Sequence, residues 1–259
     1  VESRGLGDVY KRQVENCVGR SSASGLKFGT VSRGGFRNFK VKNIKIYDTY
    51  RSAITFAAVD GALIENIEVD GVRSIHTGNV IYLRIGDRWS AGKKPIMKNI
   101  TIKNVYAEIP MDKPDAGYNY EGPIEDLPRN ISPASIVGLP EYKIQNVTLQ
   151  NIEIVSPGGG NPYYAYRGLA PAELDSIPEM ATSYPEFSQF KELPAWGFYI
   201  RHAEGITFDN VTFKALKKDY RPAIVMDDAG EVTFKDVRFI EPEGEGKKQI
   251  FPYKSKVIK

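Results

Sequence analysis

A short pattern of asparagine and apolar residues recurs six times along the chain, and it constrains the fold more than any other feature. It reads Asn-apolar-x-apolar-x-Asn-apolar, with its clearest copies at residues 38–46 (NFKVKNIKI), 99–105 (NITIKNV) and 146–154 (NVTLQNIEI). Looser copies, in which glycine or an acidic residue replaces one or both asparagines, occupy residues 66–72, 205–211 and 231–237. Repetition of one unit predicts a fold that stacks equivalent segments on one another.

Each copy alternates apolar and polar residues with a period of two, which is typical of a half-buried strand. The second asparagine falls where this alternation slips, so it marks a corner between two strands. Asparagine and glycine tolerate the left-handed backbone that such a corner requires. Stacked corners would also place asparagine side chains above one another, where their amides can bond from layer to layer.

A second family of strands lies between the copies. Its members are residues 25–30, 53–57, 80–85, 135–137, 197–202 and 223–228. The first asparagine of the pattern advances by 28 and 33 residues, then by 47 and 59, and finally by 26. The excess lies in two Pro-, Gly- and Tyr-rich stretches, residues 110–133 and 156–194. We expect long loops there, on the binding face of a repeat fold.

These features predict an all-β protein, a right-handed single-stranded parallel β-helix over residues 14–242, followed by a C-terminal tail at residues 243–259. A β-sandwich gives no reason for the corner to recur at a nearly fixed offset. A propeller blade needs more residues than the early repeats contain. We expect inward-facing side chains at Phe39, Val41, Ile100, Ile102, Val147, Leu149, Ile206, Phe208, Val232 and Phe234.

The first 13 residues lack strand alternation and read as a separate segment. Residues 8–13 (DVYKRQ) resemble the translated end of a transposon used in preparing sequencing libraries. We therefore expect residues 1–13 to be non-native or disordered and to contribute nothing to the core. The alternative is an ordinary polar N-terminal loop.

Composition excludes several classes of function. One cysteine and two histidines make a His/Cys metal centre improbable, so we expect neither a metal nor a cofactor. The net charge of +3 is too small for a nucleic-acid-binding surface, although it suits an acidic small molecule or polymer. No apolar run is long enough to cross a bilayer. We expect a monomer without nucleic-acid or membrane partners.

Several segments resemble glycoside hydrolase family 28, the polygalacturonase family. Residues 26–30 (LKFGT) followed by 34–38 (GGFRN) are similar to its middle coils, as are 59–66 (VDGALIEN) followed by 81–88 (IYLRIGDR). Residues 193–202 (LPAWGFYIRH) are similar to a divergent branch. The resemblance covers about residues 14–239. It implies a pectin-lyase-like solenoid, secreted or periplasmic, that hydrolyses glycosidic bonds in uronate-containing polysaccharide.

The sequence also departs from that family. The resemblance implies that the family's catalytic aspartates lie upstream of Val14, so we expect this chain to lack them. The family's Gly-His-Gly would fall at residues 23–25 (ASG), and its Arg-Ile-Lys would fall at residues 55–57 (TFA). This branch therefore either uses other residues or has lost catalysis.

Candidate catalytic residues in the chain itself are Asp60, Asp87 and His202. Asp60 and Asp87 follow strand ends, where binding loops often lie, but Asp60 also begins a turn and Asp87 could pair with Arg88. His202 could act as an acid, as a base or as a ligand of a sugar hydroxyl, or it could be a packed or capping residue.

Candidate substrate-binding residues come from the polar positions of the second strand family. We expect these positions to form one exposed stripe of Lys27, Tyr82, Arg84, Tyr199, Arg201 and Asp227. Arginine and lysine would bind sugar carboxylates, and tyrosine would stack on sugar rings. A solvated sheet face is the alternative.

Two other functions share this architecture. A polysaccharide lyase needs a calcium site or a base that removes the proton α to a carboxylate. A noncatalytic carbohydrate-binding protein needs neither of these.

Overall fold

The computed structural model describes residues 8–112, 114, 132–160 and 168–258 of the chain, and for residues 8–11 it describes the backbone alone. This part contains twelve strands and one short helix, α1 (Pro171–Asp175). The long strands are β4 (Gly35–Ala58), β5 (Leu63–Ile85), β6 (Ile96–Glu108), β8 (Ile144–Gly158), β9 (Phe198–Lys217) and β10 (Ile224–Ile240). The short ones are β1 (Asp8–Glu15), β2 (Val18–Ser21), β3 (Leu26–Phe28), β7 (Ala134–Val137), β11 (Ile250–Tyr253) and β12 (Val257–Ile258).

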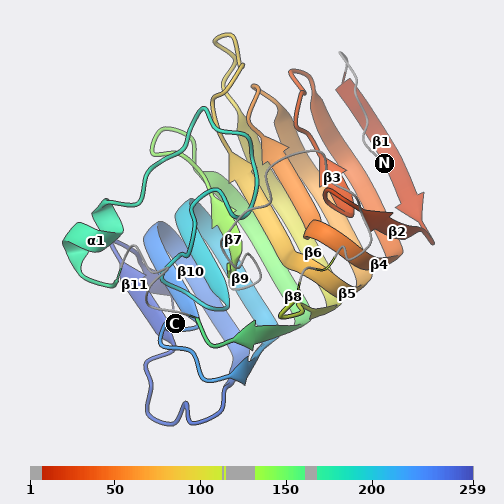
Figure 1. Ribbon diagram of the computed structural model, residues 1–259. Coiled ribbons are helices and arrows are strands. Elements are labelled where there is room, and N and C mark those ends of the chain that lie inside the picture. Colours follow the sequence, from red (N-terminus) through yellow and green to blue (C-terminus); the bar gives the residue numbers. More distant parts are fainter. Residues whose placement is uncertain (1–7, 113, 115–131, 161–167, 259) are drawn as a thin grey trace.

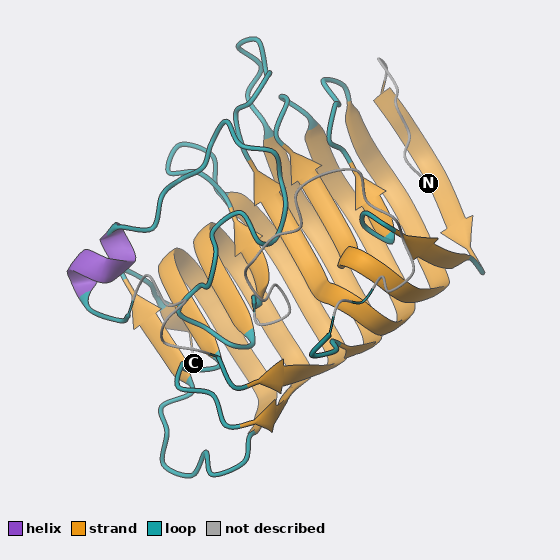
Figure 2. Ribbon diagram, viewed as in Figure 1, coloured by secondary structure: helices purple, strands orange, loops and turns teal. Residues whose placement is uncertain are grey.

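All named strands pair in parallel within one sheet, so the predicted all-β class and parallel pairing are confirmed. Figure 1 shows the strands side by side from β1 at one end to β11 at the other. Strands β5, β6, β8, β9 and β7 form a closed circuit of pairings. Loops and the single helix project from this stack of strands (Figure 2).

The asparagines form two ladders along the stack, as the repeat predicted. In the first ladder each amide donates to the preceding layer: Asn66 to Asn38 (3.0 Å), Asn99 to Asn66 (3.0 Å) and Asn146 to Asn99 (3.1 Å). The second ladder runs through Asn43, Asn104, Asn151 and Asn210, whose φ angles are 52–56°. Gly71, with φ 81°, takes this position in β5. The left-handed corner therefore explains why these positions hold asparagine or glycine.

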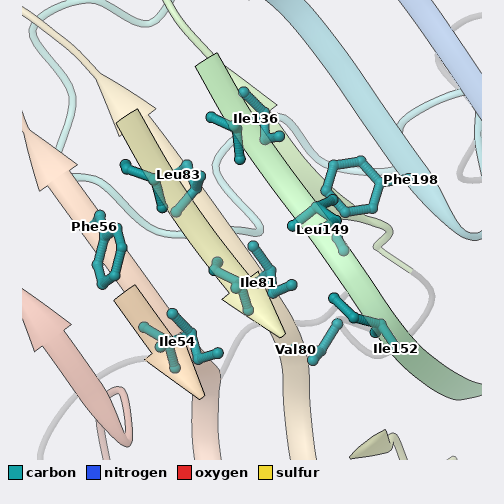
Figure 3. Packing of buried hydrophobic residues seen from close by; sticks show 14 of the residues in the cluster. Ile54, Phe56, Val80, Ile81, Leu83, Ile136, Leu149, Ile152 and Phe198 are labelled. Carbon is teal, nitrogen blue, oxygen red and sulfur yellow. The ribbon is translucent and has the colours of Figure 1, made fainter. Parts of the chain in front are cut away.

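The predicted inward residues line an apolar interior. Nine of them are at most 7% exposed, and Phe234 is half-buried against the same core, stacked on Phe208. Figure 3 shows how Phe56, Leu83, Ile136 and Phe198 from neighbouring layers contribute to this interior. Alternation along each strand therefore directs one apolar row into the core at every layer.

A second, smaller apolar cluster lies on the opposite face of the short segments formed by β7 and the starts of β9 and β10. There Val137, Tyr199 and Val225 pack against residues of the long connection before β9, namely Leu174, Ile177, Phe190, Leu193 and Ala195. Residues 169–195 therefore form a cover over this face, and we call them the cover segment. Of the two predicted loop stretches, residues 113, 115–131 and 161–167 lie outside the described residues.

The two chain ends contain more regular structure than the sequence indicated. Residues 8–13 belong to β1, which pairs with β4 from Gly35 to Lys42, and the side chains of Arg12 and Gln13 are exposed. Whether residues 1–13 are native stays a prediction. The tail at 243–259 includes β11 and β12, both paired with β10. No helix of the described residues is long and apolar enough to cross a membrane.

Candidate functional site

The predicted stripe residues stack on successive strands in the expected order. Tyr82, Ser135 and Tyr199 occupy one row, and Lys27 joins this row through Thr55. Arg84, Val137, Arg201 and Asp227 occupy the next polar row, two residues further along each strand. The predicted register is therefore confirmed.

The expected exposure of the stripe is wrong: Lys27 is half-buried, and every other member is buried. Tyr82 and Arg84 are each 1% exposed, Tyr199 is fully buried, and Arg201 and Asp227 are 7% and 3% exposed. The physical reason is the cover segment, whose apolar side chains seal this sheet face. Four of the five predicted substrate-binding residues, Tyr82, Arg84, Tyr199 and Arg201, therefore lie beneath the cover.

Arg84 is held by oxygen atoms of the protein on two sides. Its guanidinium donates to the carbonyl of Gly138 (3.0 Å) and to the carbonyl of Glu179 in the cover segment. The same group lies 5.2 Å from the ring centre of Phe190, also in the cover segment. Through these contacts Arg84 connects the sheet to the cover segment.

Arg201 and His202 form a second connection with the same segment. Arg201 donates to the carbonyl of Ile177 (2.7 Å) and forms ion pairs with Glu179 (2.7 Å) and Asp227 (3.1 Å). Burial raises the pKa of Asp227, and the charge of Arg201 opposes this only in part. Although burial alone would raise it, the hydrogen bond from His202 and the charge of Arg201 hold the pKa of Glu179 below its usual value.

His202 is 6% exposed, and its ring bridges two carboxylates. Nδ1 lies 2.8 Å from Asp228 and Nε2 lies 3.1 Å from Glu179. Burial would raise the pKa of Asp228, but hydrogen bonds from Lys143 and His202 lower it. The ring nitrogens are thus engaged by the protein, and this geometry supports the packed alternative for His202 over a role as acid or base.

The two predicted catalytic aspartates differ sharply in their surroundings. The Asp60 carboxylate is fully buried and accepts two bonds from Arg88, at 3.1 and 2.7 Å. Asp60 is therefore the partner of Arg88, and Asp87 is not. Asp87 is exposed; its backbone N–H donates to the Ala181 carbonyl (2.8 Å), and its carboxylate accepts a hydrogen bond from Ser90. Of these two aspartates, only Asp87 offers a carboxylate to solvent.

A group of basic and aromatic side chains surrounds Tyr184, which lies on the exposed side of the cover segment. The Tyr184 hydroxyl accepts hydrogen bonds from Lys27 (2.9 Å) and Arg51 (3.4 Å). The charged groups of Lys27, Arg51 and Arg88 lie 5.1, 5.2 and 5.5 Å from the centre of the Tyr184 ring. The guanidinium of Arg88 also stacks on Trp89 at 3.7 Å. We call Lys27, Arg51, Arg88, Trp89 and Tyr184 the Tyr184 patch.

The Tyr184 patch is accessible and contains three cations. Tyr184 is 44% exposed and Trp89 is 56% exposed. Burial opposes the shift, yet the hydrogen bond from Lys27 and the charges of Lys27 and Arg51 lower the pKa of Tyr184 to about 8. Two acidic groups balance part of the charge, because Arg51 pairs with Glu186 (3.2 Å) and Arg88 with Asp60. A phenol of this kind can lose its proton near neutral pH and is surrounded by cations that attract an anionic ligand.

Sequence reasoning found Lys27 in this patch but missed the other four residues. They arise from the corner after the second segment of β4, from the loop after β5 and from the cover segment, so no single repeat position contains them. The exposed tryptophan and the aromatic composition of the 156–194 stretch were the available signals.

Among the residues that the structure describes, no three His, Cys, Asp or Glu side chains are grouped so as to hold a metal ion. Comparison with protein-family models, curated proteins and solved structures finds no match to this chain.

Proposed function

We propose that this chain is part of a right-handed parallel β-helix glycoside hydrolase that acts on acidic, pectin-type polysaccharide. The Tyr184 patch is the observation that carries the proposal. It combines three cations with two exposed aromatic rings, which is the chemistry needed to bind a sugar carboxylate and stack on a sugar ring. The protein would act as an extracellular or periplasmic monomer.

The winding of the chain supports the β-helix part of this proposal. Each layer repeats the order of corner, strand and connection, and equivalent residues pair in parallel with the next layer. The two asparagine ladders hold these equivalent corners in register. A coil that advances by one layer per repeat satisfies all of these pairings with short connections.

The catalytic part of the proposal rests on Asp87, an exposed acid that adjoins the Tyr184 patch in the chain. Asp87 directly precedes Arg88, and its backbone bonds to Ala181, three residues before Tyr184. A hydrolase needs two carboxyl groups on opposite sides of the bond. We propose that Asp87 supplies one of them.

A polysaccharide lyase is a second candidate, favoured by the lowered pKa of Tyr184 and by its position. In β-elimination, a base removes the proton α to the uronate carboxylate, and a cation neutralises that carboxylate. A C=C bond then forms as the glycosidic C–O bond at the β carbon breaks, and the leaving oxygen takes up a proton from water. Tyr184 as phenolate would be the base, and Arg51 or Arg88 would be the cation. This reaction needs no second carboxylate.

The test incubates the chain with polygalacturonate and follows two products, new reducing ends and the ultraviolet absorbance of an unsaturated sugar. Reducing ends without unsaturated product, lost in Asp87→Asn, would support hydrolysis. Unsaturated product, lost in Tyr184→Phe, would support the lyase and overturn the hydrolase. Lys40→Met, an exposed cation on the same strand as Arg51, is the matched control and should leave either activity unchanged.

Calorimetric titration with polygalacturonate measures binding in case neither product forms. Binding without either product, weakened at least tenfold in Arg51→Met but not in Lys40→Met, would refute both enzymes. It would leave the noncatalytic carbohydrate-binding reading. Absence of binding would overturn the assignment of the Tyr184 patch itself.

A further inference from the structure

A groove that shares no residue with the Tyr184 patch follows the asparagine ladder that begins at Asn43. It has a volume of ≈ 680 Å³, and its lining residues come from β4, β5, β6, β8, β9 and β10. Six stacked strands at the usual spacing of about 4.8 Å give it a length of roughly 24 Å. The groove therefore crosses the strands and runs along the axis of the stack.

We propose that this groove binds a linear acidic polysaccharide lying along the stack. The inference is independent of which reaction the Tyr184 patch performs, because it concerns different residues on different segments of each layer. It assigns the groove a role as an anchoring site that holds a long polymer and does not cleave it.

The ladder supplies a regular row of hydrogen-bond donors. Asn43, Asn104, Asn151 and Asn210 all line the groove, and each donates one amide hydrogen to the preceding layer. A side-chain amide carries two N–H donors, so each asparagine retains a second donor. These donors recur with the spacing of the layers except at β5, where Gly71 takes the position, and a polymer of repeating sugars presents its oxygens at regular intervals too.

The charged side chains of the groove favour an acidic polymer. Its lining includes three cations, Lys45, Arg73 and Arg238, and one anion, Glu153. The Arg73 guanidinium lies 4.7 Å from the ring centre of Tyr106, which also lines the groove. This pair combines a cation with an aromatic ring, the two groups that recognise a uronate.

Other extended polymers fit the groove less well. A peptide that binds by strand addition needs a free sheet edge, whereas this groove crosses strands that, except at the β10 end, are paired on both sides. Single-stranded nucleic acid binds through several stacking rings and strong positive charge. The groove offers one aromatic ring, and the whole chain carries a net charge of only +3.

The test measures affinity for polygalacturonate chains of increasing length, with dextran as a neutral control. For the unaltered chain, affinity should rise with length until the polymer spans the groove, and dextran should not bind. The double variant Arg73→Glu/Arg238→Glu should lose at least tenfold in affinity for the long polymer. Both side chains are exposed, so folding should be unaffected, as a thermal melt would verify.

Short oligomers separate this inference from the proposed function. The double variant should bind or cleave a trisaccharide as the unaltered chain does, whereas Arg51→Met should weaken that interaction and leave the length dependence intact. Unchanged affinity of the double variant for the long polymer would overturn the groove assignment. Equal affinity for all chain lengths would also overturn it. If the double variant lost trisaccharide binding and Arg51→Met did not, the result would count against the Tyr184 patch.

Discussion

Replacing Arg201 with methionine tests whether this residue binds substrate or ties the cover segment to the sheet. Methionine keeps much of the side-chain volume but removes the positive charge and its donors. Three acceptors then lose a partner: the carbonyl of Ile177 and the carboxylates of Glu179, which keeps His202, and of Asp227. If Arg201 were a ligand-binding arginine on a solvated face, its removal would leave no buried acceptor without a partner.

The magnitude follows from the burial of Asp227. Its side chain is only 4% exposed, so water cannot replace the guanidinium. Breaking a buried ion pair from one side costs about 3–5 kcal/mol, because it leaves a buried charge without compensation. Arg238 offers a matched control, since its ion pair with Asp236 has both side chains about 60% exposed. Arg238→Met should cost no more than about 0.5 kcal/mol.

Urea denaturation measures both variants, with the free energy of unfolding taken from linear extrapolation. The double variant Arg201→Met/Asp227→Leu should recover most of the stability lost in Arg201→Met, because neither charge remains buried. If Arg201→Met lowered the free energy of unfolding at pH 7 by less than about 1 kcal/mol, Arg201 would not connect the cover segment to the sheet. The prediction of a solvated stripe would then stand for this residue.

The stability lost in Arg201→Met should also depend on pH, in a direction that the pKa of Asp227 determines. Burial already raises the pKa of Asp227 in the folded protein above the usual value of an aspartate, and loss of Arg201 should raise it further. Between the unfolded and folded pKa values the folded state binds more protons, so stability falls as the pH rises. The difference in stability between the unaltered chain and Arg201→Met should therefore be larger at pH 7 than at pH 4.

Three further predictions concern the core, the N-terminus and the patch. Ile102→Asp places an unpaired charge at a fully buried position and should abolish cooperative thermal unfolding, whereas Ile102→Val should cost about 0.5–1.5 kcal/mol. Deletion of residues 1–13 should leave the melting temperature within error, and a clear fall would mean that the pairing of β1 with β4 stabilises a native segment. Alkaline titration followed by ultraviolet absorbance should show one phenol ionising at about pH 8, and Tyr184→Phe should remove that step; its persistence would contradict the environment described for Tyr184.

The repeat predicted the parts of the fold that depend on local pattern. Alternation identified the inward rows, and the conformational tolerance of asparagine identified the corners. The stripe was predicted in the right register because stacking of equivalent positions determines which residues are neighbours. Its burial could not be predicted in this way, because the cover comes from an insertion that follows no repeat. The apolar residues Phe187, Phe190 and Leu193 were a signal that this insertion packs on something, since each is at most 1% exposed.

The cover segment also explains why the accessible cations lie where they do. It buries the guanidinium groups of Arg84 and Arg201 by satisfying them with its own carbonyls and with Glu179. A few residues later the same segment leaves Tyr184 exposed beside Lys27 and Arg51. An acidic ligand approaching this face therefore meets the Tyr184 patch first, and it could reach the buried arginines only by displacing several charge-assisted bonds, each of which contributes about 1.5–3 kcal/mol. For that reason the Tyr184 patch, and not the predicted arginine stripe, is the place where the search for a substrate should begin.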